Sequence, residues 1–209
     1  MSGNSLKIYC AGPLFNPKER EDMNSIATIL ETAGYTVFLP QRDGLELARL
    51  LPVLTERDIS EKEASIVLNN AIFSLDVFEI IDSDGVILNI NGRVPDEGAM
   101  VEAGIAWAHG KPIVIFKNDD RSLIQGNCNP LVMGLADFEF VDKYEKIPAA
   151  FANNFSEKNT NTPKKSSFSI TNTKGEAIRD YLMAQKTANE IADLLIDLFG
   201  DVLCQSLKK

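Results

Sequence analysis

Short apolar runs alternate with amphipathic helical segments along the first two thirds of this chain. Each run is bounded by turn residues and is short enough for a buried strand; the predicted strands are 6–10, 35–39, 86–89, 111–116 and, as the last, 138–141. Three longer segments repeat apolar residues at helical spacing; they are 17–33, 60–81 and 98–109. Strands that alternate with helices predict a parallel sheet covered by helices on both faces.

The predicted class is therefore an α/β fold of the Rossmann-like or flavodoxin-like kind. In such sheets a ligand binds beyond the carboxyl ends of the strands. The loops that follow the strands are the places to search for a site; they are 11–16, 40–44, 90–98 and 117–129.

A change in composition divides the chain. We expect an α/β domain over 1–152 and then a flexible linker over 153–174, which is rich in Asn, Ser, Thr and Lys. Apolar residues at helical spacing return afterwards, and they predict a C-terminal helical extension over 175–209.

The charge of the chain restricts its partners. The 209 residues carry a net charge of −9, which argues against nucleic acid as a partner. The three cysteines are scattered and lack CxxC spacing, and the one histidine, His109, cannot form a metal cluster, so no metal site is expected. We expect a cytoplasmic protein, since the polar N-terminus lacks a signal-peptide pattern and no apolar run approaches the length of a membrane span.

One stretch, 95–104, concentrates the residues that suit chemistry. Asp96 can cap the helix that follows, and Gly98 lets a ligand approach the backbone closely. Glu102 lies one turn further along without an obvious cationic partner, so it is a candidate nucleophile or acid/base. Asp76 is a third acid near the end of an element. The ordinary alternatives are a helix cap for Asp96 and solvated helix residues for Glu102 and Asp76.

The chain lacks two phosphate-binding motifs. It has no GxGxxG after the first strand and no GxxxxGK[ST], so it lacks the glycine-rich device that dinucleotide-binding folds and P-loop proteins use. No organic cofactor is expected.

Two motifs resemble those of the nucleoside 2-deoxyribosyltransferases. The run 8–16, Ile-Tyr-Cys-Ala-Gly-Pro-Leu-Phe-Asn, is similar to that family's first strand, which ends in a Tyr-x-Ala-Gly-Pro-like turn. Pro95-Asp96-x-Gly98-x-x-x-Glu102-x-Gly104 is similar to its active-site signature, in which the last acid is the nucleophile. Asp76 precedes Asp96 at the spacing of the family's other active-site Asp. The resemblance covers roughly residues 6–141.

The resemblance implies that the base of a 2′-deoxynucleoside is exchanged for a free purine or pyrimidine base. Glu102 would form a covalent deoxyribosyl ester, Asp76 or Asp96 would give a proton to the leaving base, and Tyr9 would orient Glu102. The predicted substrate-binding residues are Gly12, Phe15, Gln41, Asp43, Gly98, Asn129 and Met133. For Phe15, Gln41 and Asp43, an ordinary core-covering or polar-turn role stays open.

The resemblance also implies a homo-oligomer whose sites are completed across subunit interfaces. Family members commonly have Asn-Leu-Met in a late loop that reaches a neighbouring subunit, whereas this chain has Asn129-Pro-Leu-Val-Met133. The chain also continues well beyond its last predicted strand, so family contacts made by the chain terminus cannot be transferred.

Two other functions stay open. An N-glycoside hydrolase of nucleoside 5′-monophosphates would use the same carboxylate with water as acceptor, and its phosphate anchor would have to be Lys18, Arg20 or Arg42. A non-catalytic nucleoside-binding module would keep the pocket and tolerate loss of Glu102.

Overall fold

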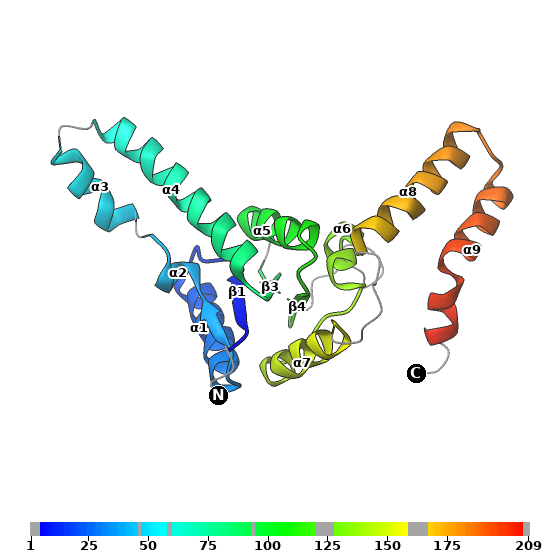
Figure 1. The fold of residues 1–209 in the computed structure, drawn as a ribbon, viewed down its shortest axis with the longest axis horizontal. Helices are drawn as coiled ribbons and strands as arrows, with labels where there is room; N and C mark the ends of the chain where they lie inside the picture. Colours follow the sequence, from blue (N-terminus) through cyan, green and yellow to red (C-terminus); the bar gives the residue numbers. More distant parts are fainter. Residues whose placement is uncertain are drawn as a thin grey trace. The chain divides into compact units, whose positions relative to one another are not determined.

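The computed structural model describes residues 5–45, 47–57, 60–92, 95–119, 128–158 and 167–206, with the side chains at 157–158, 167–168 and 200–206 left out. The chain divides into two compact units, Met1–Asn161 and Thr162–Lys209, and each is described here by itself. The first unit is an α/β domain, and the second is a pair of helices (Figure 1).

A parallel sheet forms the centre of the first unit. Its four strands are β1 (Lys7–Ala11), β2 (Thr36–Phe38), β3 (Gly85–Asn89) and β4 (Ile113–Phe116). They are ordered β2-β1-β3-β4, and every neighbouring pair is parallel. The α/β fold class predicted from the sequence is confirmed.

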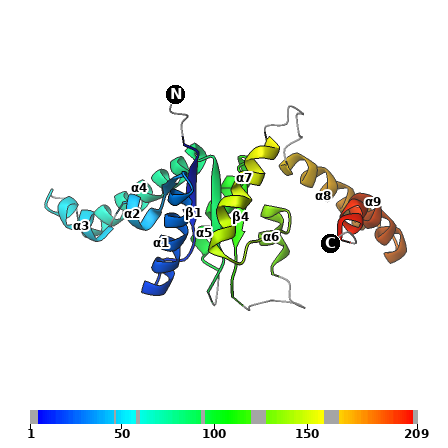
Figure 2. The ribbon, with the colours of Figure 1, turned by 90° about the horizontal axis from the view of Figure 1, so that it is seen from below.

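Helices cover both faces of this sheet, as Figures 1 and 2 show. Because side chains alternate along a strand, Ile8 and Cys10 of β1 pack with α1 and α7, while Tyr9 and Ala11 pack on the other face, against α4 and α5. These helices are α1 (Pro17–Thr32), α4 (Glu61–Asp82), α5 (Glu97–Ala108) and α7 (Ile147–Lys158). Two separate apolar cores result, one on each side of the strands.

Local capping residues fix where the long helices start. Asn16 caps α1 and Ser60 caps α4, each in a capping box completed by a glutamate three residues later. Asp96 caps α5 through a bond from the Gly98 N–H. The predicted starts of these three helices agree with the structure to within one residue.

Between β1 and α7, two predictions about local structure are wrong and one helix was not predicted. The last strand, 138–141, is absent, because Asp137 and Phe138 take positive φ angles and turn the chain, so that only Val141 forms a bridge to Phe116. The predicted loop at 40–44 is the short helix α2 (Pro40–Asp43), in which the Asp43 carboxylate accepts a bond from the Leu39 N–H. The helix α3 (Leu47–Thr55) was not predicted and has Pro52 inside it. Short helical turns also follow β4; they are α6 (Pro130–Met133), η1 (Gly134–Ala136) and η2 (Tyr144–Lys146).

The segment expected to be a flexible linker is helical over much of its length. Helix α7 continues to Lys158, and α8 (Ser167–Met183) begins before 174; residues 159–166 lie outside the described part. The single C-terminal helix expected over 175–209 is two helices, α8 and α9 (Ala188–Ser206). Asn, Ser and Thr have modest helix propensity, which is why composition alone favoured a linker here.

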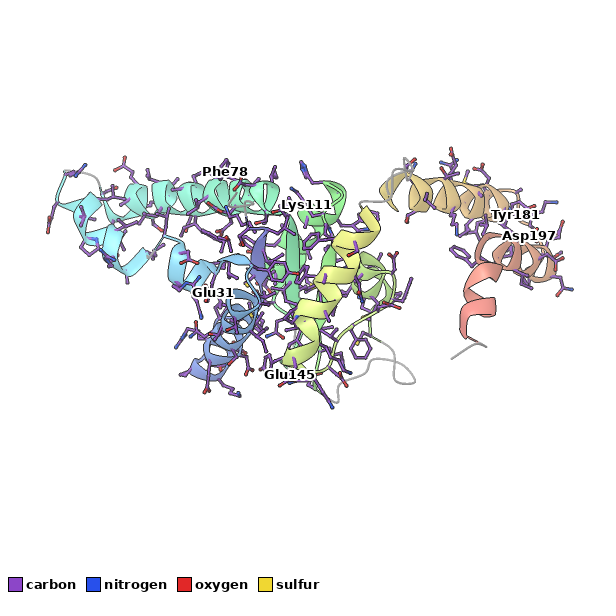
Figure 3. The ribbon with its side chains drawn as sticks, turned by 60° about the horizontal axis from the view of Figure 1, so that its bottom comes forward. Glu31, Phe78, Lys111, Glu145, Tyr181 and Asp197 are labelled. Carbon is purple, nitrogen blue, oxygen red and sulfur yellow. The ribbon has the colours of Figure 1, made fainter. Side chains whose placement is uncertain are left out.

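Helix α4 exposes a long apolar stripe. Ile66, Val67, Phe73 and Phe78 are all at least half exposed on this helix, and α3 runs beside it (Figures 1 and 3). Among the described residues, α4 is the one helix that is long and apolar enough, by length and composition, to cross a membrane. The sequence had predicted no such segment. Of the most apolar window of α4, 17% is buried. Helices of water-soluble proteins pass the same test.

Gly12, directly after β1, is a position where the backbone packs closely against its neighbours. A Cβ there would lie 2.5 Å from Met23 Sδ and 2.9 Å from Asn89 Cβ. We expect Gly12→Ala to lower the free energy of unfolding by about 1–3 kcal/mol, because the side chains of a packed core must shift. Urea denaturation measures this. Gly98→Ala is the matched control, since its nearest non-neighbouring atom would lie at 3.6 Å, and equal stabilities of the two variants would contradict the prediction.

Candidate active site

The centre of the site is a hydrogen bond between Tyr9 and Glu102. The Tyr9 hydroxyl donates to Glu102 Oε1 at 2.7 Å. Tyr9 comes from the central strand β1 and its side chain is fully buried, whereas Glu102 lies one turn into α5 and is partly buried. The bond therefore joins the sheet to the helix that packs on it, and it holds the carboxylate in one orientation.

A second aromatic ring holds the Tyr9 ring in place. Phe38, the last residue of β2, stacks on Tyr9 with 5.6 Å between ring centroids and 17° between ring planes. The parallel register pairs these two residues on adjacent strands, so their side chains lie on the same face. The sequence did not predict a role for Phe38. It is an aromatic residue on a strand, and its pairing with Tyr9 follows only from the register of β1 and β2.

The two aspartates lie within electrostatic range of Glu102. Asp76 is on α4 and is partly buried, and Asp96 precedes the first residue of α5. Asp96 Oδ1 accepts a bond from the Gly98 N–H at 3.1 Å, so its role as a helix cap is confirmed. Helices α4 and α5 pack against each other, which brings an acid from each of them towards Glu102.

These surroundings shift the pKa values of Glu102, Asp76 and Tyr9. Burial raises the pKa of Glu102 to about 7; the Tyr9 hydroxyl opposes this rise, and the negative charges of Asp76 and Asp96 add to it. Burial also raises the pKa of Asp76, with help from Glu79. Burial and the Glu102 carboxylate raise the pKa of Tyr9, which stays a hydroxyl donor. The site thus combines a carboxylate whose pKa is raised to about 7 with a second acid whose pKa is also raised, a pairing suited to nucleophilic and acid catalysis.

Asparagines tie the loop after β3 to the loop after β4. Asn91 and Asn118 exchange two hydrogen bonds, of 2.7 and 2.9 Å, and the Gly92 N–H donates to Asp119. Buried Asn89, the last residue of β3, accepts a bond from the Asn91 N–H. These residues anchor the start of the loop that leads to Asp96. The sequence signal for them was their place at the carboxyl ends of two neighbouring strands.

Of the predicted substrate contacts Gly12, Gly98 and Phe15, the structure buries the first and exposes the other two. Gly12 is buried against Met23 and Asn89, and this packing accounts for the absence of a side chain. Gly98 is exposed at the start of α5, one turn before Glu102. Phe15 follows the turn after β1 and is 77% exposed, so it does not cover the core and is free to contact a ligand.

Gln41 and Asp43 of α2 are engaged in holding the fold. Gln41 Nε2 donates to the Arg20 carbonyl and to Asn24 Oδ1, which ties α2 to α1. Asp43 pairs with Arg42 and accepts from the Leu39 N–H. Within the described ranges, no hydrogen bond or ion pair joins either residue to Tyr9 or Glu102. Their role in recognising a base stays a prediction.

Asn129 and Met133 lie at the two ends of α6. Asn129 is exposed and caps this helix by accepting from the Leu131 N–H. Met133 is 7% exposed and packs in the same apolar cluster as Tyr9 and Ala103 of α5. Met133 therefore supports the helix that carries Glu102, and Asn129 is the residue of this pair whose side chain faces solvent.

The three cations considered as phosphate anchors all have partners. Lys18 pairs with Asp22, Arg20 donates to the Leu14 carbonyl, and Arg42 pairs with Glu31 and Asp43. In the part of the chain that the structure describes, no group of three His, Cys, Asp or Glu side chains could hold a metal ion.

The fold and these residues define an α/β protein with a carboxylate site beside a parallel sheet. A family model described as nucleoside 2-deoxyribosyltransferase matches residues 8–161. The chain belongs to the nucleoside 2-deoxyribosyltransferase family. A comparison with curated proteins found no match.

Solved structures share the fold. A conserved protein from Enterococcus faecalis V583 is 22% identical, with a TM-score of 0.53, over 72% of this chain and 99% of that one. A 2-deoxyribosyltransferase from Bacillus psychrosaccharolyticus is 22% identical, with a TM-score of 0.51, over 68% and 90%. A CMP N-glycosidase from Clostridium botulinum is 16% identical, with a TM-score of 0.41, over 70% of this chain and 98% of that one.

Removing the Tyr9 hydroxyl should raise the pKa of Glu102 above about 7. The hydroxyl donates to the charged carboxylate and stabilises it, so Tyr9→Phe favours the protonated form and shifts the pKa upward by roughly one unit. A carboxyl-carbon NMR titration measures the shift. Tyr35→Phe is the control, because the Tyr35 hydroxyl contacts the Pro148 carbonyl instead. An unchanged Glu102 titration in Tyr9→Phe would refute the bond.

Proposed function

We propose that this protein exchanges the base of a 2′-deoxynucleoside for another free base, with Glu102 as the nucleophile. The observation that carries the proposal is the Glu102 carboxylate, held by Tyr9 and flanked electrostatically by Asp76 and Asp96. Membership of the family over residues 8–161 supports the same activity.

The first half of the reaction cleaves the glycosidic bond. A Glu102 oxygen attacks C1′ of the sugar while the bond from C1′ to the base nitrogen breaks, through an oxocarbenium-like transition state. A protonated Asp76 or Asp96 gives its proton to the leaving base, whose nitrogen anion would otherwise be a poor leaving group. The product is a deoxyribosyl ester of Glu102 and a neutral base.

The second half reverses these steps with another base. A ring nitrogen of the incoming base attacks C1′, the ester bond breaks, and the released proton returns to the aspartate. Glu102 is restored as a carboxylate. Two displacements at C1′ retain the β configuration and predict ping-pong kinetics.

The surroundings of the cations favour a nucleoside over a nucleoside monophosphate. Each of the three candidate phosphate anchors is paired with a carboxylate or a carbonyl within the first unit. A phosphate bound there would share each cation with an acceptor that it already meets, which weakens the attraction between the cation and the phosphate.

The activity is tested with deoxyinosine and free adenine, and again with thymidine as donor, followed by chromatography. We expect deoxyadenosine from the wild type and a loss of at least about 1,000-fold in Glu102→Ala, because the covalent route is removed. Glu97→Gln is the matched control, since Glu97 is an exposed acid on the same helix. Free hypoxanthine without a new nucleoside would contradict the transferase and indicate a hydrolase. No turnover would contradict both and indicate a nucleoside-binding module.

We also propose that the apolar stripe of α4, Ile66, Val67, Phe73 and Phe78, packs against a second copy of the chain. An exposed patch of this kind marks an interface. Asp76 lies on the same helix, so pairing there would bring a neighbouring subunit close to the site.

Phe73→Glu should therefore lower the molecular mass of the assembly in solution, because Phe73 is 64% exposed and a buried charge would oppose pairing. Light scattering after size exclusion measures the mass. Ser25→Glu is the control, since it adds the same charge at an exposed position of α1, the helix on the other face of the sheet. An unchanged mass in Phe73→Glu would argue against this interface.

A further inference from the structure

Glu79 of α4 is a largely buried acid that has no role in the reaction described so far. Its side chain is 14% exposed and its Oε2 is shielded from solvent. The carboxylate forms an ion pair with Lys7 Nζ, which also donates to Asp82 Oδ2 at 2.7 Å. Removing a charge from water is costly unless a partner compensates for it. Lys7 supplies that compensation for Glu79.

The backbone of Lys7 is fixed at the start of β1. Its N–H donates to Asp84 Oδ2 at 2.8 Å, and its carbonyl accepts from the Asp84 N–H at 2.7 Å. Because side chains alternate along a strand, Lys7 and Tyr9 point to the same face of the sheet. The pair of Lys7 and Glu79 therefore joins β1 to α4 next to the place where Tyr9 holds Glu102.

Glu79 is also a neighbour of Asp76. The two acids are three residues apart on α4, so their side chains lie on one face of the helix, and both are partly buried. Burial raises the pKa of Asp76, and the negative charge of Glu79 adds to this rise. Asp82, the other partner of Lys7, is 51% exposed and lies about 9 Å further than Asp76 along the helix axis.

The other charges around α4 leave this role to Glu79. Strand β1 and helices α3 and α5 pack against α4 (Figure 1). Among the described residues, the charged or titratable side chains that they bring to it are Lys7, Tyr9, Arg49, Glu97 and Glu102, with Asp96 directly before α5. The remaining charges of α4 are Glu61, Lys62 and Glu63 in its first turn and Asp82 at its end. Glu79 is thus the acid one turn from Asp76 that makes and breaks no bond itself.

We propose, on the basis of the base exchange proposed above, that Glu79 is a positioning residue which acts through Asp76. Anchored by Lys7, its negative charge keeps a proton on Asp76 until the leaving base takes it. An aspartic acid in an ordinary environment is ionised at neutral pH and has no proton to give. When the proton passes to the base nitrogen, Asp76 becomes a carboxylate and Glu102 becomes a neutral ester, so the charge of the site is unchanged. The incoming base later returns its proton to Asp76.

A carboxyl-carbon NMR titration of Asp76 tests this role. Glu79→Gln removes the charge and keeps the shape of the side chain, so we expect Asp76 to titrate at lower pH than in the wild type. Asp82→Asn is the matched control, since it removes the other carboxylate that Lys7 contacts and should leave the Asp76 titration unchanged. Glu79→Asp keeps the charge, so Asp76 should titrate closer to its wild-type pH than in Glu79→Gln.

The pH profile of base exchange gives a second measurement. On its alkaline side, kcat/KM of Glu79→Gln should fall by roughly three- to tenfold, because a smaller fraction of Asp76 is protonated there. Asp82→Asn should keep the wild-type profile. Loss of an ion pair with Lys7 by itself would affect both variants, so equal profiles of Glu79→Gln and Asp82→Asn would overturn the proposal.

The titration needs no turnover, so it separates this proposal from the proposed function. Base exchange together with the same Asp76 titration in the wild type and in Glu79→Gln would overturn the role of Glu79 alone. A lowered Asp76 titration in Glu79→Gln without any base exchange would overturn the proposed function, and it would support only the effect of the Glu79 charge on Asp76.

Discussion

The central strand β1 is the element on which the rest of the first unit depends. It pairs with β2 on one side and β3 on the other, and its alternating side chains supply both cores. Because Tyr9 points to the face that α5 covers, its hydroxyl reaches Glu102. The packing that stabilises the sheet therefore also orients the Glu102 carboxylate, and a change in the register of β1 would remove both effects.

The environment of Glu102 makes its ionised form unfavourable. Burial and the neighbouring charges of Asp76 and Asp96 oppose ionisation of Glu102, and the Tyr9 hydroxyl compensates for part of this cost. In a sugar-transfer reaction the developing positive charge at the anomeric carbon would relieve the crowding of negative charge. In the proposed reaction the arrangement would stabilise the cationic transition state more than the neutral bound substrate.

Apolar surface without a partner recurs in both units. In the first it follows α4, and in the second it follows the outer side of α9. A helix of a globular protein normally shows one apolar stripe towards its core, whereas these helices carry a second one. Such a stripe is stabilised when another surface covers it, and for α4 the proposed surface is a second copy of the chain.

The sequence by itself determined the alternation of strands and helices in the first unit, the helix caps Asn16 and Asp96, and the candidate acids, because these depend on local periodicity and spacing. It misread 138–141 and 153–174, where positive φ angles and helix packing override composition. Only the tertiary structure decided that Phe38 stacks on Tyr9, that Asp76 acts on Glu102, and that Gln41 and Asp43 are held in the fold. Those relations depend on strand register and on how helices pack, and local sequence patterns determine neither of them.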